Sequence, residues 1–94
     1  MRFTFDPNKD NANIEKHGLS LADAPLVFNA PDKLTLVSPR AGEARLMDVA
    51  LVEVAGVVLV LVYVLRKADE VRAISLRRAS KQERTLYADH QKSG

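Results

Sequence analysis

The chain has 94 residues, of which 47% are hydrophobic and 28% are charged, and none is cysteine. A chain of this length and composition is expected to form a single folded domain over residues 1–94 and not to be disordered. The lack of cysteine excludes disulfides and thiolate metal sites.

The net charge of +2 is unevenly distributed along the chain. Residues 1–38 carry four Lys and Arg against five Asp and Glu, whereas residues 66–94 carry eight against four. A polyanionic partner would therefore be met by the C-terminal third. The alternative interpretation is that this basic segment is only a solvated surface.

The first residues predict a short strand followed by a helix. Residues 2–5 alternate polar and aromatic side chains, as a strand does. Asp6 and Pro7 are typical of a helix start. The Asp6 carboxylate can accept hydrogen bonds from the free N–H groups of the first turn, and Pro7 lacks an N–H that would have been unpaired there. Gly18 is typical of a helix end. We therefore expect a largely exposed, polar helix over residues 7–17.

A second helix and two strands are predicted next. Ser20 has the form of a helix start, but Pro25 would remove an internal hydrogen bond, so the regular helix is expected to begin near Asp23. Apolar alternation then predicts a strand over residues 34–38. A loop over residues 39–43 and a strand over residues 45–54 are predicted to follow.

The most hydrophobic segment is the run of nine apolar residues over 57–65, rich in valine. Such a run is typical of a strand that is buried on both faces. A turn and a further strand over residues 71–76 follow. Ser80 then predicts the start of a helix over residues 81–90, with Glu83 at the spacing of a capping box. Residues 91–94 are expected to be a frayed tail.

The predicted element order is therefore β-α-α-β-β-β-β-α. The connections among the last four strands are short, which favours antiparallel neighbours, since parallel crossovers need a dozen or more residues. The helices should cover one face or end of this largely antiparallel sheet. The sequence thus predicts an α+β fold.

Other function classes have little support in the sequence. The apolar run over 57–65 is about half of the length that crosses a bilayer, and no signal-peptide pattern is visible, so we expect a cytoplasmic protein. His17 and His90 are far apart, and neither has ligand spacing with a carboxylate. No phosphate-binding loop, dinucleotide fingerprint or serine-hydrolase motif is present. We therefore expect no metal ion or other cofactor.

A set of arginines follows the predicted central strands. Arg66 ends the apolar strand, Arg72 lies inside the next strand, and Arg77 and Arg78 end it. Side chains alternate along a strand, so Arg77 and Arg78 should point to opposite faces of the sheet. If the strand is regular, Arg72 should share a face with Arg78.

These cations fit the requirements of RNA cleavage without a metal. That reaction needs a group that activates the 2′-hydroxyl, cations that stabilise charge on the phosphate, and a proton donor for the leaving 5′-oxygen. Arginine suits the second role through its planar fork of donors. His17 is the only histidine outside the tail, which makes it the candidate for proton transfer.

Structural roles remain open for both kinds of residue. His17 lies at the end of a predicted helix, where a positive side chain favours the helix dipole. Arg72 would pair with a carboxylate on a neighbouring strand, either Glu53 or Asp48.

A series of short motifs occurs in a fixed order along nearly the whole chain. They are Phe5-Asp6, Asn13-x-x-Lys16-His17-Gly18, Ser20, Asp23-Ala24, Val27-Phe28, Gly42-Glu43-x-Arg45, Val62-Tyr63, Arg66, Arg72-x-Ile74-Ser75-x-Arg77-Arg78-Ala79 and Glu83-Arg84-x-x-Tyr87. Each motif alone is a weak signal, but this many in the right order are specific. On these motifs the sequence resembles the BrnT toxins of bacterial type II toxin–antitoxin systems.

The resemblance implies a small ribonuclease toxin with a fold similar to that of RelE toxins. It also implies a cognate BrnA-like antitoxin of the ribbon-helix-helix type, whose complex with the toxin binds operator DNA and represses their operon. The chain departs from the family pattern at Val64-Leu65, where it is more apolar. This departure motivates an alternative, in which the chain is a non-catalytic interaction module or a corepressor acting only with its antitoxin on DNA.

The basic segment and the resemblance together lead to a predicted site. The residues predicted to be catalytic are His17, Arg66, Arg77 and Arg78. The residues predicted to bind RNA are Lys16, Arg72, Lys81, Arg84 and Tyr87, with the tyrosine stacking on a base or donating a proton. This site requires the end of the first helix to fold back onto the basic edge of the sheet.

Overall fold

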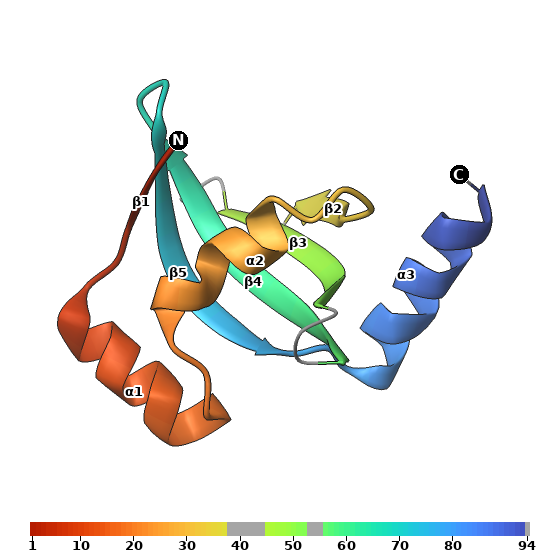
Figure 1. Ribbon diagram of the computed structural model, residues 1–94, viewed down its shortest axis with the longest axis horizontal. Helices are drawn as coiled ribbons and strands as arrows, with labels where there is room; N and C mark the ends of the chain where they lie inside the picture. The colour runs from red at the N-terminus through yellow and green to blue at the C-terminus, as the bar shows by residue number, and fades with distance from the viewer. Residues whose placement is uncertain (38–44, 53–55, 94) are drawn as a thin grey trace.

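The computed structural model describes residues 1–37, 45–52 and 56–93 (Figure 1). Its elements are β1 (Arg2–Thr4), α1 (Pro7–His17), the 3-10 helix η1 (Leu21–Asp23), α2 (Ala24–Phe28), β2 (Leu34–Val37), β3 (Arg45–Val52), β4 (Val57–Arg66), β5 (Glu70–Arg78) and α3 (Lys81–Ser93). The predicted α+β fold and element order are confirmed. The predicted loop over 39–43 and the ends of the strands predicted over 34–38 and 45–54 lie outside the described residues.

The strands form one sheet in the order β1-β5-β4-β3-β2. Neighbours from β2 to β5 are antiparallel, as the short connections predict. β1 pairs with β5 in parallel, with Arg2 opposite Glu70. The Glu70 carboxylate accepts hydrogen bonds from Thr4 (2.7 Å) and Arg2 (3.3 Å), so it ties the first strand to the last one.

Local capping explains where α1 and α2 begin. The Asp6 carboxylate accepts the Asn8 N–H at 2.8 Å, and Gly18 adopts φ 71° and donates to the Ile14 carbonyl at 2.7 Å, so both predicted ends of α1 are confirmed. Ser20 caps η1 instead of a regular helix, and α2 begins at Ala24. The predicted later start of the second helix is therefore correct.

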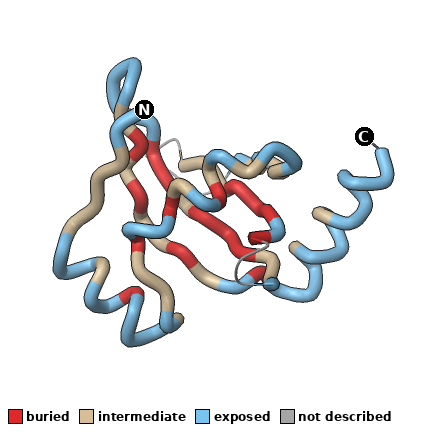
Figure 2. Tube along the Cα trace, in the orientation of Figure 1, coloured by how far each residue is buried: buried red, intermediate tan, exposed pale blue. Residues whose placement is uncertain are grey.

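One face of the sheet packs against α2 and forms the main core (Figures 1 and 2). Its fully buried centre includes Leu61 and Leu76 of the sheet and Val27 of α2. The Phe28 ring packs edge-on between Phe3 and Tyr63, with both ring-centroid distances at 5.4 Å. The middle of the central strand is thus buried, but Leu65 is exposed and Val57, Val58 and Val62 are half-buried, so the predicted burial on both faces is confirmed only in part.

A buried carboxylate on this face is fully paired. Asp48 is 0% exposed and accepts hydrogen bonds from Lys33 (2.8 Å), Thr35 (2.7 Å) and Tyr63 (3.0 Å). Burial, together with the negative Asp48, raises the pKa of Tyr63. The suggested Arg72–Asp48 pair is wrong, since Lys33 takes that carboxylate; Glu53, the other suggested partner, lies outside the described residues.

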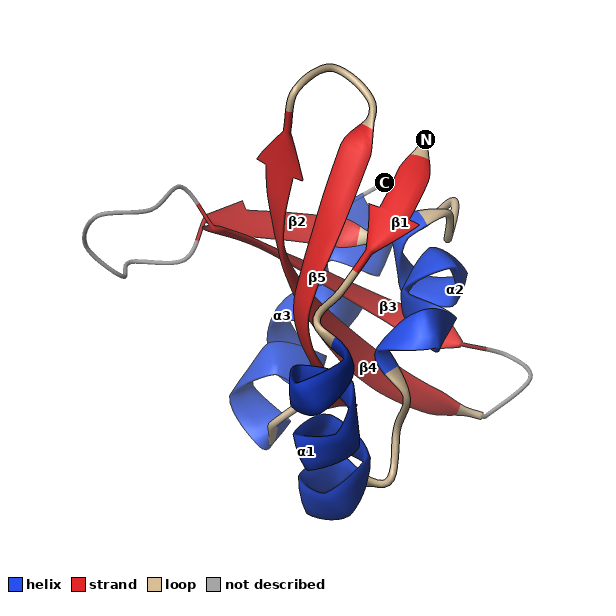
Figure 3. Cartoon of the chain, turned by 90° about the vertical axis from the view of Figure 1, so that its left-hand side faces the viewer, coloured by secondary structure: helices blue, strands red, loops and turns tan. Residues whose placement is uncertain are grey.

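The opposite face of the sheet is less completely covered. Val49, Val60 and Ala79 are buried there, against the half-buried Tyr87 of α3. Figure 3 shows α2 and α3 on opposite sides of the sheet. None of the described residues of α3 is buried, so this helix is attached mainly through its first turn and through Tyr87.

The predicted end of the last helix needs correction. α3 continues to Ser93 instead of fraying after residue 90, because the helix keeps its own hydrogen bonds and Gln91 donates to the Asp32 carbonyl at 3.0 Å.

In the described part of the chain no helix reaches the length and apolarity that crossing a membrane would need.

A bulge in β5 changes which arginines share a face of the sheet. Val62 pairs with Ser75 and Tyr63 pairs with Ala73, so Ile74 is an extra residue in β5. An extra residue reverses the alternation of side chains beyond it. Arg72, opposite Val64, and Arg77, opposite Val60, therefore share the less covered face.

Arg78 lies opposite Leu59, a residue of the main core on the other face. The prediction that Arg77 and Arg78 diverge is consistent with this pairing. The prediction that Arg72 shares a face with Arg78 is wrong, because it assumed a regular strand.

Candidate functional site

The end of α1 and the less covered face of the sheet form a cavity of about 400 Å³. Its lining residues are Lys16, His17, Arg45, Met47, Val62, Ile74, Ser75 and Arg77. The predicted convergence of the first helix with the basic end of β5 is therefore observed for three residues, Lys16, His17 and Arg77. Arg45 joins them from β3.

Asn13 fixes α1 beside β5. Its side-chain amide donates to the Leu76 carbonyl (2.8 Å) and to the Leu19 carbonyl (2.8 Å), and its carbonyl oxygen accepts the Leu76 N–H (3.1 Å). The register of β1 covers β5 only over Glu70–Arg72. The Asn13 side chain therefore takes the place of a strand neighbour at Leu76 and satisfies a buried stretch of sheet edge. This contact positions Lys16 and His17, one turn later, over the cavity.

Arg77 is held by Glu83 of α3. Nη1 and Nη2 of Arg77 donate to the two carboxylate oxygens at 2.7 and 2.8 Å, a bidentate pair. The hydrogen bond from Arg77 is the main reason that the pKa of Glu83 falls to about 2, and the same bond raises the pKa of Arg77. Both groups are thus charged at neutral pH, and the guanidinium has a fixed orientation.

The same carboxylate also begins α3. Glu83 Oε1 accepts the Ser80 N–H at 2.8 Å, and Ser80 Oγ accepts the Glu83 N–H at 3.2 Å, which confirms the predicted capping box. The Glu83 side chain is only 13% exposed. One carboxylate therefore both stabilises the first turn of α3 and fixes the Arg77 side chain.

Arg77 still has donors to offer. Of the five N–H donors of a guanidinium, Glu83 uses one on Nη1 and one on Nη2, and the Arg78 carbonyl accepts another from Nη1 at 3.3 Å. Among the described residues, Nε and the second Nη2 hydrogen, which lie along one edge of the guanidinium, have no hydrogen-bond partner. That edge can bind two oxygens of a phosphate in the bidentate manner.

The floor of the cavity is apolar, in contrast to its rim. Met47, Val62 and Ile74 come from three adjacent strands, and each is half-buried. Ser75 contributes a hydroxyl group beside them. The cavity thus combines an apolar floor with four basic side chains around it.

Arg45 was not among the residues predicted for the site. It is the first residue of β3 and lies opposite Val64, which in turn lies opposite Arg72. The only signal in the sequence was its place in the motif Gly42-Glu43-x-Arg45, and that motif gives no spatial information.

Several predicted site residues lie outside this cavity. Arg66 is exposed at the end of β4 opposite Glu70, and Arg72 is half-buried on the cavity face without lining the cavity. The pKa of Glu70 is lowered mainly by the hydrogen bond from Thr4. The positive charges of Arg2, Arg66 and Arg72 lower it further. These arginines therefore belong to the electrostatic environment of the β4–β5 hairpin.

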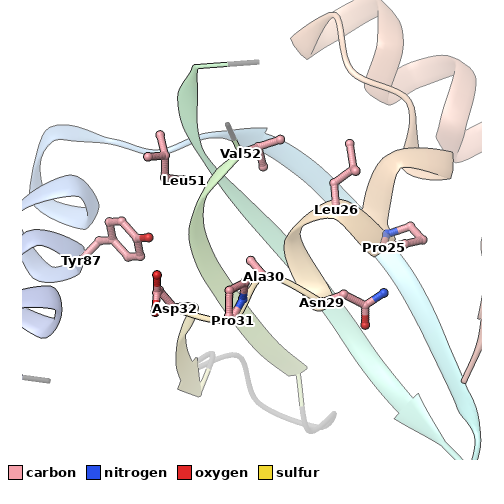
Figure 4. A pocket seen from close by; sticks show the side chains of 9 residues that line it. All are labelled: Pro25, Leu26, Asn29, Ala30, Pro31, Asp32, Leu51, Val52 and Tyr87. Carbon is pink, nitrogen blue, oxygen red and sulfur yellow. The ribbon is translucent and has the colours of Figure 1, made fainter. Parts of the chain in front are cut away.

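The remaining basic residues and Tyr87 lie near α3. Arg78 and Arg84 line a separate cavity of about 270 Å³, and Lys81 is exposed on the first turn of the helix. Tyr87 lines a third cavity of about 510 Å³, between the α2–β2 connection and α3, together with Asp32 and Leu51 (Figure 4). The structure does not bring these residues together with His17 and Arg77.

Within the described ranges, no three His, Asp or Glu side chains gather in a way that could hold a metal ion.

The comparisons with known proteins agree on one family. The model of the family described as "Ribonuclease toxin, BrnT, of type II toxin-antitoxin system" matches residues 5–83. Among solved structures, the chain is similar to the ribonuclease toxin BrnT of Brucella abortus, with a TM-score of 0.65 and 25% sequence identity over 86% of this chain and 99% of that one. A search of curated proteins finds no match.

Proposed function

The chain belongs to the BrnT family of ribonuclease toxins of type II toxin–antitoxin systems, and on this basis we propose that it cleaves RNA in the cavity between α1 and β5, without a metal ion. The observation that carries the proposal is the convergence of Lys16, His17, Arg45 and Arg77 on one cavity. These residues come from three segments far apart in the sequence, and each is basic. A cavity of this kind suits a phosphodiester.

The proposed reaction is attack of a ribose 2′-hydroxyl on the adjacent phosphorus. The new bond joins the 2′-oxygen to phosphorus, and the bond from phosphorus to the 5′-oxygen breaks. The products are a 2′,3′-cyclic phosphate and a 5′-hydroxyl. His17 is the side chain of the cavity best suited to move a proton near neutral pH, either from the 2′-hydroxyl or to the leaving 5′-oxygen.

The arginines supply charge stabilisation in this scheme. Negative charge builds on the phosphate oxygens in the transition state, and a guanidinium already fixed in place stabilises it without reorganisation. Arg77 is held in this way by Glu83 and keeps one edge for a phosphate. Lys16 and Arg45 would hold the substrate backbone on either side.

We also propose that the toxin is held inactive by a cognate BrnA-like antitoxin of the ribbon-helix-helix type in the cytoplasm, and that the complex binds operator DNA. The support for the antitoxin is the family itself, which is defined by its place in type II toxin–antitoxin systems. Arg66, Arg78, Lys81, Arg84 and Tyr87 lie outside the cavity and are proposed to contact RNA or partner only at a distance from the cut.

The test is cleavage of a single-stranded RNA by purified protein in the presence of EDTA. We expect His17→Ala and Arg77→Ala each to lower kcat/KM by about 100-fold or more, since loss of a proton-transfer group or of one charge-stabilising donor typically has this effect. Lys92→Ala removes a charge from the exposed end of α3 and serves as the control.

Three results would contradict the proposal. EDTA could abolish cleavage, or both cavity variants could cleave like the wild type. The third is a wild-type protein that cleaves no RNA yet enhances operator binding by the antitoxin, which would establish the corepressor alternative.

A further inference from the structure

We propose that the apolar floor of the cavity binds one unpaired nucleobase next to the phosphate that is cut, so that the substrate is single-stranded RNA. This inference rests on the proposed ribonuclease function and adds the part of the substrate that the floor recognises. It is carried by the floor residues, by the bulge that presents them, and by the cations around them.

The floor is apolar surface that the fold leaves uncovered. On the same face of the sheet, Val49 and Val60 are 0% exposed, because Ala79 and neighbouring side chains cover them. One step along the same strands, Met47 and Val62 are only half-buried and line the cavity. Uncovered apolar surface at the bottom of a concave site is typical of ligand binding.

The β5 bulge builds this floor. In a regular strand two consecutive side chains point to opposite faces, so only one of them could line a given cavity. Ile74 and Ser75 are consecutive, yet both line this one, because Ile74 is the extra residue of the bulge. Bulges that redirect a side chain occur next to active sites. Here the bulge places an apolar surface and a hydroxyl group side by side.

The surroundings of the floor specify a ligand with two properties. Four basic side chains line the same cavity, which favours a ligand with negative charge. The floor itself has no charge, which favours a ligand with an apolar face. A nucleotide combines a phosphate with a flat base. In a duplex that base is stacked and its faces are hidden, whereas in a single strand it is free to turn out.

The cavity volume agrees with the binding of one base. About 400 Å³ lies in the range of small-molecule sites. None of the three floor residues is aromatic, so the base would pack on the aliphatic side chains of Met47, Val62 and Ile74, which contact any base alike. Ser75 adds a hydroxyl group to the lining, and in this proposal it bonds a base edge.

The test uses a short single-stranded RNA with one cleavage site, in which each nucleotide in turn is replaced by an abasic ribose. The phosphates are unchanged, so only the contribution of each base is removed. We expect the abasic residue at one position beside the cut to lower kcat/KM about tenfold or more, because the apolar contact of one base with the floor is lost. Abasic residues elsewhere should change it by less than about threefold.

A matched pair of variants links this penalty to the floor. Val62 and Val58 are both half-buried valines on the same face of β4, but Val58 lies outside this cavity. Val62→Ala should reduce the abasic penalty at the sensitive position at least threefold, whereas Val58→Ala should leave it unchanged. Binding of the same RNAs, with a 2′-deoxyribose at the cut to prevent cleavage, is measured in parallel.

The outcomes separate this inference from the proposed function. Cleavage of every abasic RNA at the rate of the intact one overturns the base subsite and leaves the ribonuclease in place. If no RNA is cleaved, the ribonuclease proposal fails, and the binding series alone then supports or overturns the subsite. If Val62→Ala weakens inhibition by the antitoxin but leaves the abasic penalty unchanged, the floor is a protein-docking surface and the base subsite is wrong.

Discussion

The Glu83 carboxylate has two structural roles beside the cavity. Its carboxylate accepts two hydrogen bonds from Arg77 and one from the Ser80 backbone. A charged group with several such partners loses its stabilising effect when it is neutralised, even if its shape is kept. The charge of this one residue therefore affects both the attachment of α3 and the orientation of Arg77.

Glu83→Gln should lower the free energy of unfolding at pH 7 by about 1–2 kcal/mol, as the loss of charged hydrogen bonds does. The pKa of Glu83 is about 2 in the folded protein, below its ordinary value of 4.5. A group with a lowered pKa stabilises the fold above its ordinary pKa, and this contribution disappears as pH falls from about 4.5 toward 2. Urea unfolding of both proteins should therefore show a smaller difference in the free energy of unfolding at pH 3 than at pH 7.

Asp89→Asn is the matched control, because it removes a carboxylate from the exposed surface of the same helix. It should change the unfolding free energy by less than about 0.5 kcal/mol. If the free energies of unfolding of wild type and Glu83→Gln differ as much at pH 3 as at pH 7, the ion pair is not the cause of the difference.

At the scale of elements, α1 is positioned by polar side chains: Asp10 accepts the Leu21 N–H of η1 at 2.6 Å, and Asn13 anchors the helix to β5. It is polar and mostly exposed, with only Asn13 buried among its described residues. Asn13 pairs with both backbone groups of Leu76. The position of Lys16 and His17 over the cavity thus depends on a helix that contributes little apolar burial of its own.

Asn13→Ala should lower the free energy of unfolding by about 2–3 kcal/mol, because it leaves the buried N–H and C=O of Leu76 without partners. It should also lower kcat/KM for RNA about tenfold or more at a temperature where circular dichroism shows the variant to be folded. Asn11→Ala, an exposed change on the same helix, is the control. Full activity of folded Asn13→Ala would show that α1 does not need this anchor to place His17.

The sequence predicts the elements better than their contacts. Asp6, Gly18 and Ser80 mark helix ends through local hydrogen bonds, so these ends are predictable from neighbouring residues alone. The bulge at Ile74 depends on how β5 packs between α1 and β4, and no glycine or proline marks it. Because one extra residue reverses the faces beyond it, the prediction for Arg72 and Arg78 failed there.

The site was predictable only in part for the same reason. Lys16, His17 and Arg77 could be identified as basic residues near element ends, and the structure brings them together. Arg45 reaches the cavity through the pairing of β3 with β4, which spacing along the chain does not reveal. Glu83 was predicted as a helix cap, but its pairing with Arg77 arises from the corner between β5 and α3.

On the scale of the whole molecule, the basic residues are divided among several places. Those of the cavity form one group, while Arg78 and Arg84 line another cavity and Arg66 lies at the hairpin end. The net charge is only +2. Binding of a short RNA should therefore reflect the few cations of the cavity and not the charge of the entire protein.

This division predicts the salt dependence of RNA binding. Three permanent cations line the cavity, namely Lys16, Arg45 and Arg77. With about 0.7 counterions released per contact on a single strand, log K for a hexanucleotide should fall with log salt at a slope of about −2. Lys16→Ala should reduce that slope by about 0.7, and Lys92→Ala should leave it unchanged. A slope near −5 would mean that the RNA contacts a much larger basic surface.

The cavity is assembled from residues that are distant in the chain, so the proposed site is completed late in the synthesis of the protein. Its walls come from residues 16 and 17, 45 and 47, 62, and 74, 75 and 77, and Glu83 fixes Arg77. A chain leaves the ribosome from its N-terminus. While β5 and the first turn of α3 are still inside the ribosome, Ile74 and Arg77 are absent from the folded part. If this cavity is the site of cleavage, as we propose, the nascent chain cannot cleave RNA until β5 and the first turn of α3 have left the ribosome.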